Sequence, residues 1–301
     1  MKRTLGTVGT VCTLCTLACS PSLPNADGAL VDKLRILALR ADPPEVSPGK
    51  PSALDALVSD PKGAGRALTY TWLACDPNVR DFYGTSCSDE RKLADLAALA
   101  AAPGTHALGA ATTSAYTPPA DVFAALAKDS PIRFFGSTAD AVLVVSAGSF
   151  ADAASGKVEA AVAVVHIAVS ELPANVQNAN PPLAPLRVGT MDVDAGTPLA
   201  PDEASLCAVA GAGASQVFYE LDPESPMGFR MRNEALFAEW HTTTGTLTEL
   251  PDAGLPADPN LAVLHGCQAL SAPDAKAGDA IDVVLRDGRG GVSFARWPLA
   301  R

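Results

Sequence analysis

Apolar and polar residues alternate in short runs along most of the chain, and turns rich in proline and glycine separate the runs. In 68–73, a period of two places Leu68, Tyr70 and Trp72 on one face of an extended segment. We expect strands at 34–39, 54–58, 68–73, 141–145 and 158–169 in the first half, and at 186–193, 204–209, 235–240, 279–284 and 292–299 in the second. This pattern predicts a mainly β fold.

The two halves of the chain follow the same plan. Each contains a strand that carries a tryptophan, Trp72 or Trp240, and later a Val-rich strand followed by a last strand. The segment that begins at Asp279 echoes the one that begins at Asp140, which aligns these two residues. We therefore expect two similar units, each with its tryptophan buried in the core.

The order of these elements resembles bacterial immunoglobulin-like, PKD-like and cadherin-like modules. The segments that carry the resemblance are Pro44–Gly49, Leu68–Trp72 and Asp287–Val292. It implies two tandem immunoglobulin-like β-sandwiches, each of about seven strands around a buried Trp. One departure matters: His265 stands where an antibody-type domain has a Tyr two residues before its second Cys, and two more strands follow Cys267. An antibody-type disulfide is therefore not expected, and the topology within each sandwich stays open.

The spacing of the repeated strands predicts the domain boundaries. We assign 33–171 to a first sandwich and 186–301 to a second, joined by a linker at 172–185 that contains four prolines. The first unit is longer between its Trp and its Val-rich strand, which predicts a helical insertion at about 76–130. Helices are expected at 89–101 and 117–128. Such an insertion either covers a sheet edge or forms a binding surface.

The amino-terminal residues indicate export. Lys2 and Arg3 precede an uncharged stretch and small residues around Ala18, which is the pattern of a signal peptide over 1–18. The segment Thr16–Cys19 resembles the lipobox of bacterial lipoproteins, which implies a diacylglycerol thioether on Cys19 and a flexible tether over 19–32. Ser20 after the cysteine implies the outer membrane in that family. The alternative is an ordinary signal peptide with an incidental Cys.

Four cysteines remain after the signal peptide and the lipidated residue are set aside. An even number in an exported chain favours disulfides, and sequence distance favours Cys75 with Cys87 and Cys207 with Cys267. Three pairings are possible, and a metal site is the rival interpretation. The sequence after the signal peptide has no CxxC motif and no histidines at ligand spacing to support a metal site.

Composition and motifs limit the chemistry. A net charge of −11 opposes nucleic-acid binding, and no apolar run after the signal peptide is long enough to span a membrane. The chain contains no HExxH, GxSxG or P-loop motif, so we expect neither catalysis nor a cofactor. Asp192 and Asp194 are weak calcium candidates, with further carboxylates in turns at Asp222, Glu224 and Asp287, but the favoured interpretation is a solvated acidic surface.

These observations predict an outer-membrane-anchored lipoprotein of the cell envelope, acting as a non-catalytic binding, adhesion or spacer module. Its partners would be the membrane, through the lipid anchor, and an envelope protein or glycan. The first alternative is a carbohydrate- or peptide-binding accessory subunit, for which Tyr83, Tyr116 and Trp297 are the candidate exposed aromatics. The second is a hydrolase whose active-site residues are scattered along the chain.

Overall fold

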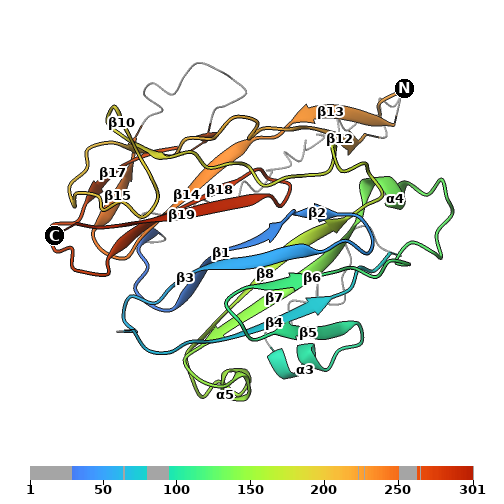
Figure 1. Cartoon of the computed structure of the whole chain (residues 1–301), viewed down its shortest axis with the longest axis horizontal. Coiled ribbons are helices and arrows are strands. Elements are labelled where there is room, and N and C mark those ends of the chain that lie inside the picture. Colours follow the sequence, from blue (N-terminus) through green and yellow to red (C-terminus); the bar gives the residue numbers. More distant parts are fainter. Residues whose placement is uncertain are drawn as a thin grey trace, which may run out of the picture.

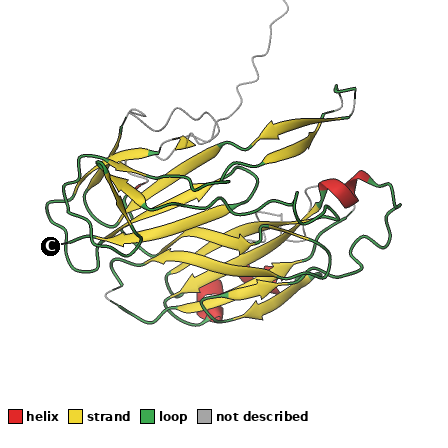
Figure 2. Ribbon diagram, turned by 45° about the horizontal axis from the view of Figure 1, so that its top comes forward, coloured by secondary structure: helices red, strands yellow, loops and turns green. Residues whose placement is uncertain are grey.

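The computed structural model describes residues 29–63, 65–79, 95–222, 224–226, 228–250, 263–264 and 266–300. Within these ranges the chain is mainly β, as the alternation predicted, with five sheets and three short helices (Figure 2). The signal peptide, Cys19, Tyr83, Cys87 and His265 lie outside the described residues. No helix of the described chain is long and apolar enough to cross a membrane.

The N-terminal half forms two sheets that pack face to face (Figure 1). The first has the order β1 (Arg35–Asp42), β3 (Ser52–Ser59), β6 (Ser114–Tyr116). The second has the order β2 (Glu45–Val46), β8 (Ala160–Val169), β7 (Ser137–Ser146), β4 (Thr69–Cys75), β5 (Thr105–Gly109). The chain changes sheets at Pro43 and Pro44, because β1 pairs with β3 whereas β2 pairs in parallel with β8. We call this half the N-terminal sandwich.

Large apolar side chains from both sheets fill the N-terminal sandwich. Trp72 is fully buried, and its Nε1 donates a hydrogen bond to the carbonyl oxygen of Ala111 at 3.1 Å. Leu68 and Tyr70 pack on the same cluster, so the face predicted from the alternation is confirmed. Each large side chain buried in this way stabilises the fold by about 1.5–3 kcal/mol.

The C-terminal half forms a second pair of sheets and a separate ribbon. One sheet has the order β10 (Met191–Val193), β9 (Leu186–Val188), β11 (Leu206–Cys207), β17 (Cys267–Ser271), β15 (Thr246–Glu249). The other has the order β16 (Val263–Leu264), β14 (Leu236–Thr242), β18 (Ala280–Arg286), β19 (Val292–Pro298). The ribbon consists of β12 (Val217–Leu221) and β13 (Phe229–Asn233). We call the two packed sheets the C-terminal sandwich.

Two tryptophans are buried in the C-terminal sandwich. Trp240 lies in its core, as predicted. Trp297 was expected on the surface and is instead 1% exposed, with Nε1 donating to the Val193 carbonyl oxygen at 3.2 Å. The period of two explains the correction, because Ala295 and Trp297 share one side of β19 and lie opposite Val283 and Ile281, which belong to that core.

The strand pairing repeats between the halves, but in a register different from the predicted one. β4–β7–β8 and β14–β18–β19 have the same antiparallel order, with Trp72 opposite Leu143 and Trp240 opposite Val283. Leu143 therefore corresponds to Val283, one residue away from the alignment of Asp140 with Asp279. A slip of one residue exchanges the two faces of a strand, so the predicted alignment would have placed core residues on the outer face.

The two sandwiches pack side by side rather than meeting only at a linker. Leu37 and Leu57, on the outer face of β1 and β3, contact Val284 and Val292 of β18 and β19 in one buried cluster. The Arg40 guanidinium lies 5.2 Å from the ring centroid of Phe294 across this interface. The four sheets are consequently stacked as layers, with the two central layers in contact (Figure 1).

The segment 172–185 contains neither helix nor strand apart from one isolated bridge, as its prolines predicted. It is nevertheless held by both sandwiches. Asn180 donates from Nδ2 to the Ala41 carbonyl oxygen at 2.8 Å, and its Oδ1 accepts from the Val292 backbone N–H at 2.9 Å. The segment is therefore part of the interface between the sandwiches.

The described residues of the predicted helical insertion form mainly strands and turns. β5 and β6 lie within 76–130, and the helix expected at 89–101 is described only as α3 (Leu96–Ala100). The helix expected at 117–128 is wrong: hydrogen bonds between residues three apart, such as Ala124 N–H to the Asp121 oxygen, form successive turns around buried Phe123. The other helices are α4 (Pro131–Phe135) and α5 (Phe150–Ala154).

Candidate functional site

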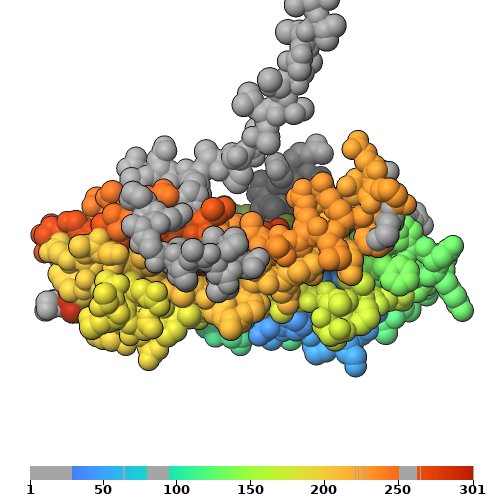
Figure 3. All heavy atoms as spheres, turned by 90° about the horizontal axis from the view of Figure 1, so that it is seen from above, coloured from blue at the N-terminus to red at the C-terminus, as the bar shows by residue number. Residues whose placement is uncertain are grey.

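A cleft of about 660 Å³ lies between the two sandwiches. One wall includes α4 and the start of β7, and the other includes the β12–β13 ribbon. The ribbon projects from one end of the molecule, above α4 in Figure 1, and its orange atoms stand out in Figure 3. Five aromatic side chains line the cleft: Phe134, Phe135, Phe218, Tyr219 and Phe229.

The α4 wall is positioned by backbone signals and one arginine. Pro131 begins the helix, and Gly136, with φ of 88°, ends it, which leaves Phe134 and Phe135 on the last turn. Arg133 donates to the carbonyl oxygens of Phe123 and Leu126 and forms an ion pair with Glu171. These bonds fix the helix and its two exposed phenylalanines against the sandwich.

The ribbon wall has one apolar and one charged face. Tyr219 and Phe229 lie on the same face and contact each other edge to face, with ring centroids 5.3 Å apart. On the opposite face, Glu220 accepts from Arg230 at 2.8 Å and pairs with Arg232 at 3.0 Å. Alternation therefore directs the charges away from the apolar face of the ribbon.

Arg289 connects the two sandwiches at the floor of the cleft. Its Nη1 donates to Glu234 Oε1 at 2.8 Å, and its Nη2 lies 3.4 Å from Glu45 Oε2 of the N-terminal sandwich. Both carboxylates are almost fully buried. The same guanidinium lies 4.7 Å from the ring centroid of Phe218, which ties the base of the ribbon to this network.

The buried carboxylates at the floor have altered acidities. Burial raises the pKa of Glu234, although its hydrogen bonds with Gln216 and Arg289 act in the opposite direction. Burial also raises the pKa of Asp287, whose Oδ1 accepts from the backbone N–H groups of Arg289 and Gly291. The turn that begins at Asp287 therefore orients Arg289 toward the cleft.

Two buried polar atoms at the cleft have no hydrogen-bond partner among the described residues, although the Asn178 side chain also acts on Asp287 by a hydrogen bond that lowers the pKa of that carboxyl. Ser137 Oγ, at the start of β7, has none among the described residues, and Ser137 is 2% exposed. The Asn178 carbonyl Oδ1 likewise has none within the described ranges, and Asn178 is 3% exposed. Buried polar atoms are nearly always hydrogen-bonded in folded proteins, so this pair marks the cleft floor as a place for an external polar group.

The three histidines in the described part of the chain are located away from this cleft. His166 Nδ1 lies 2.6 Å from Asp140 Oδ1, and this hydrogen bond raises the pKa of His166. His241 faces the interface between the sandwiches, and burial lowers its pKa. His106 stacks on Tyr116 with ring centroids 6.1 Å apart. None of these three lines the cleft.

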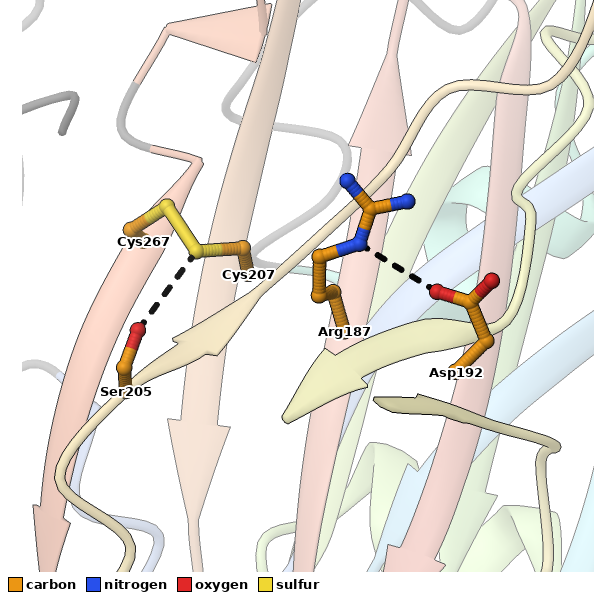
Figure 4. Close-up of a disulfide and its surroundings, with 5 residues drawn as sticks. All are labelled: Arg187, Asp192, Ser205, Cys207 and Cys267. Atoms are coloured by element: carbon orange, nitrogen blue, oxygen red, sulfur yellow. Dashed lines mark hydrogen bonds and ion pairs between the residues drawn. A yellow bond between two sulfur atoms is a disulfide. The ribbon is translucent and has the colours of Figure 1, made fainter. Parts of the chain in front are cut away.

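The disulfide between Cys207 and Cys267 is confirmed (Figure 4). It joins β11 to β17, and Ser205 Oγ lies 3.9 Å from Cys207 Sγ. Cys75 is also disulfide-bonded. Its predicted partner, Cys87, lies outside the described residues, so that pairing stays a prediction.

The structure does not bring the weak calcium candidates together with other ligands. Asp192 accepts from Arg187 at 3.2 Å on the neighbouring strand (Figure 4), and Asp194 lies in the turn that follows. The residues that the structure describes include no group of three or more His, Cys, Asp or Glu side chains able to hold a metal ion. Asp287 is bound to backbone N–H groups of its own turn.

Two of the three aromatics selected from the sequence are not exposed, and the third, Tyr83, lies outside the described residues. Tyr116 packs in the core of the N-terminal sandwich, where its hydroxyl donates to Asp76 at 2.9 Å. Trp297 packs in the core of the C-terminal sandwich. The aromatics of the cleft were missed. A run rich in β-branched and aromatic residues at 217–219, followed by a proline- and glycine-containing sequence at 222–228, was the available signal for the ribbon.

Comparison with known proteins identifies no family. No family model and no curated protein matches the chain. Among solved structures, it is similar to dimeric latent PorU from Porphyromonas gingivalis at 12% identity and a TM-score of 0.21, over 89% of this chain and 24% of PorU. The chain thus spans about a quarter of that protein's length, and a likeness this weak carries no argument about fold or function.

Proposed function

We propose that the chain is a lipid-anchored, non-catalytic protein of the bacterial cell envelope that binds a ligand in the cleft between its sandwiches. The observation that carries the binding role is the cleft itself: aromatic walls from both sandwiches enclose a floor with two unpartnered buried polar groups. Concave, mostly apolar sites with a few polar groups are typical of ligand binding.

The ion-pair network supports a binding role by holding the cleft in shape. Arg289 is bonded to carboxylates of both sandwiches, so the two walls keep their relative positions before a ligand arrives. A preformed site loses less conformational entropy on binding than one that must close around its ligand. The aromatic rings then supply apolar area, while Ser137 and Asn178 orient the bound molecule.

Cross-linking in intact envelopes tests the binding role. A benzophenone amino acid replaces Phe134, whose side chain is 46% exposed in the cleft, and in a matched chain it replaces Val162, which is 40% exposed on β8. The proposal predicts a discrete adduct after irradiation from position 134 and none from position 162. Equal adducts at both positions, or none at either, would leave only a spacer role.

The anchor rests on the resemblance of Thr16–Cys19 to a lipobox and has a separate test. Cells are grown with an alkyne-bearing fatty acid, and the wild-type chain is compared with the Cys19→Ser variant. The proposal predicts label on the wild type only, together with its recovery in the membrane fraction. Wild-type protein that is unlabelled and freely soluble would contradict anchoring without affecting the binding role.

A further inference from the structure

We infer that the cleft takes an extended, uncharged polypeptide segment with apolar side chains, laid along the edge of β12. This inference rests on the proposed binding function and specifies its ligand class. It is carried by four observations: a strand edge, the charges, the unpartnered polar groups and the aromatic walls.

The ribbon supplies a strand edge beside the cleft. β12 and β13 form a two-stranded sheet of their own, so each pairs with only one strand among the described residues. Three consecutive residues of β12, from Phe218 to Glu220, line the cleft, which places the backbone of that strand along it. A free strand edge presents N–H and C=O groups that an added strand can pair with.

The charges of the cleft favour an uncharged occupant. Glu45 and Arg289 are bonded to each other, and Glu220 is bonded to Arg230 and Arg232. Each charged residue that lines the cleft therefore already has a partner of opposite sign within the protein. A charged ligand would have to lose its hydration without gaining a free counter-charge, whereas a neutral one would not.

The unpartnered polar groups match the chemistry of a peptide backbone. The Ser137 hydroxyl can donate or accept a hydrogen bond, and the Asn178 Oδ1 can accept one. A peptide amide offers one donor and one acceptor per residue, so a single segment can satisfy both side chains. Since both are buried already, binding imposes little further desolvation on them.

The aromatic walls suit apolar side chains. Phe134 and Phe135 face the cleft from α4, and Tyr219 and Phe229 face it from the ribbon. Side chains of an extended peptide point alternately to opposite sides, so one segment can contact both walls. An oligosaccharide carries many hydroxyls, and the carboxylates that could receive them are already engaged with arginines.

The test uses the purified mature chain in lipid nanodiscs and a panel of neutral octapeptides, acetylated and amidated at their ends. The peptides alternate valine or phenylalanine with serine, and each has a control in which one central residue is proline. We expect the alternating peptides to bind, and the proline controls to bind at least about tenfold more weakly, because proline removes a strand hydrogen-bond donor.

Variants locate the binding. Ser137→Ala removes an unpartnered hydroxyl, so we expect peptide affinity to fall about threefold to tenfold, as for loss of one neutral hydrogen bond, with no loss of thermal stability. Phe135→Ala should also weaken binding. Met191→Ala, at a residue 65% exposed and outside the cleft, should leave it unchanged.

Contrary outcomes separate this inference from the proposed function. If alternating and proline peptides bind equally, the inference of an added peptide strand is wrong, but the cleft still binds a ligand. The same holds if chitohexaose binds and Phe135→Ala abolishes that binding. Sedimentation could instead show dimers whose formation depends on concentration and is lost in Tyr219→Ala. A second copy of the chain would then be the occupant of the cleft, which also overturns the peptide inference. If no probe binds and position 134 gives no adduct in envelopes, the binding function itself fails.

Discussion

The guanidinium of Arg289 lies 3.4 Å from the carboxylate of Glu45, although the two residues are 244 positions apart in the sequence. Glu45 also accepts from the Ser170 hydroxyl at 2.5 Å and from the Asn178 backbone N–H at 2.7 Å. One buried carboxylate thus binds its own sandwich, the connecting segment and the other sandwich. This arrangement makes the cleft floor a structural unit as well as part of the candidate site.

Replacement of Arg289 by Ala should destabilise the protein strongly. Glu45 and Glu234 would be left buried without their counter-charge, and breaking a buried pair in this way costs about 3–5 kcal/mol. Urea unfolding measures the change. Arg187→Ala is the matched control, since its pair with Asp192 is exposed and should contribute at most about 1 kcal/mol. Equal effects of the two variants would contradict the assigned role of Arg289.

Truncation of a core tryptophan should be costly in either sandwich. Trp72→Ala and Trp240→Ala each remove a buried ring and leave a cavity, with an expected loss of about 3–5 kcal/mol in the free energy of unfolding. Phe134→Ala, at an exposed ring, should change it by no more than about 1 kcal/mol. An unchanged urea midpoint for Trp72→Ala would show that the strand assignment is wrong.

The buried imidazole of His241 should make the protein less stable in mild acid. Burial lowers its pKa from the ordinary 6.5, and neither ring nitrogen has a partner among the described residues. Between the folded and the unfolded pKa, the unfolded chain binds more protons, so stability is lost as the pH falls below 6.5. His241→Leu should reduce this loss.

The comparison of wild type with His241→Leu isolates that effect. Glu234 and Asp287 have raised pKa values and act with the opposite sign, since their folded forms bind protons more readily as the pH falls. The raised pKa of His166 acts above 6.5, where its stabilising charge is lost as the pH rises. Urea unfolding of both chains from pH 7.5 to about 5 gives the difference; parallel curves would contradict the prediction.

Removal of the Cys207–Cys267 disulfide should destabilise the C-terminal sandwich. The bond closes a loop of 60 residues, for which chain entropy predicts a loss of about 4 kcal/mol in the double alanine variant. Thermal unfolding of the wild type and the variant under oxidising conditions, which leave the Cys75 disulfide intact in both, measures it. Ser205→Ala, which changes only a neighbouring hydroxyl, serves as the control and should leave the midpoint nearly unchanged.

The period-two alternation was sufficient to predict the fold class and the core tryptophans. The alternation did not predict which residues of neighbouring strands lie opposite each other. Trp72 lies opposite Leu143 and Trp240 opposite Val283, and these pairs align the two halves. The similarity of the two Val-rich segments does not reveal this alignment. The side chain of Trp297 was placed on the wrong side for the same reason, because its core contacts come from distant strands.

The candidate site could not be predicted from local patterns. Its walls and floor come from α4, the 172–185 segment, β12 and the turn at Arg289, which meet only because the sandwiches pack side by side. The sequence motifs indicated no catalytic site, but they could not show that the Ser137 Oγ and the Asn178 Oδ1 would be buried without a hydrogen-bond partner among the described residues. Such a property depends on three-dimensional neighbours, not on residue type.

Val31 falls in the stretch 19–32 that was expected to be a flexible tether, which is wrong for this residue: its N–H donates to the Thr242 carbonyl oxygen of β14 at 2.8 Å, and its side chain is fully buried at the shared interface. A force applied at the amino end would therefore act first on the contact between Val31 and the C-terminal sandwich, at the interface between the halves. A protein held by that end would resist the force with both sandwiches together, and they would not unfold one after the other.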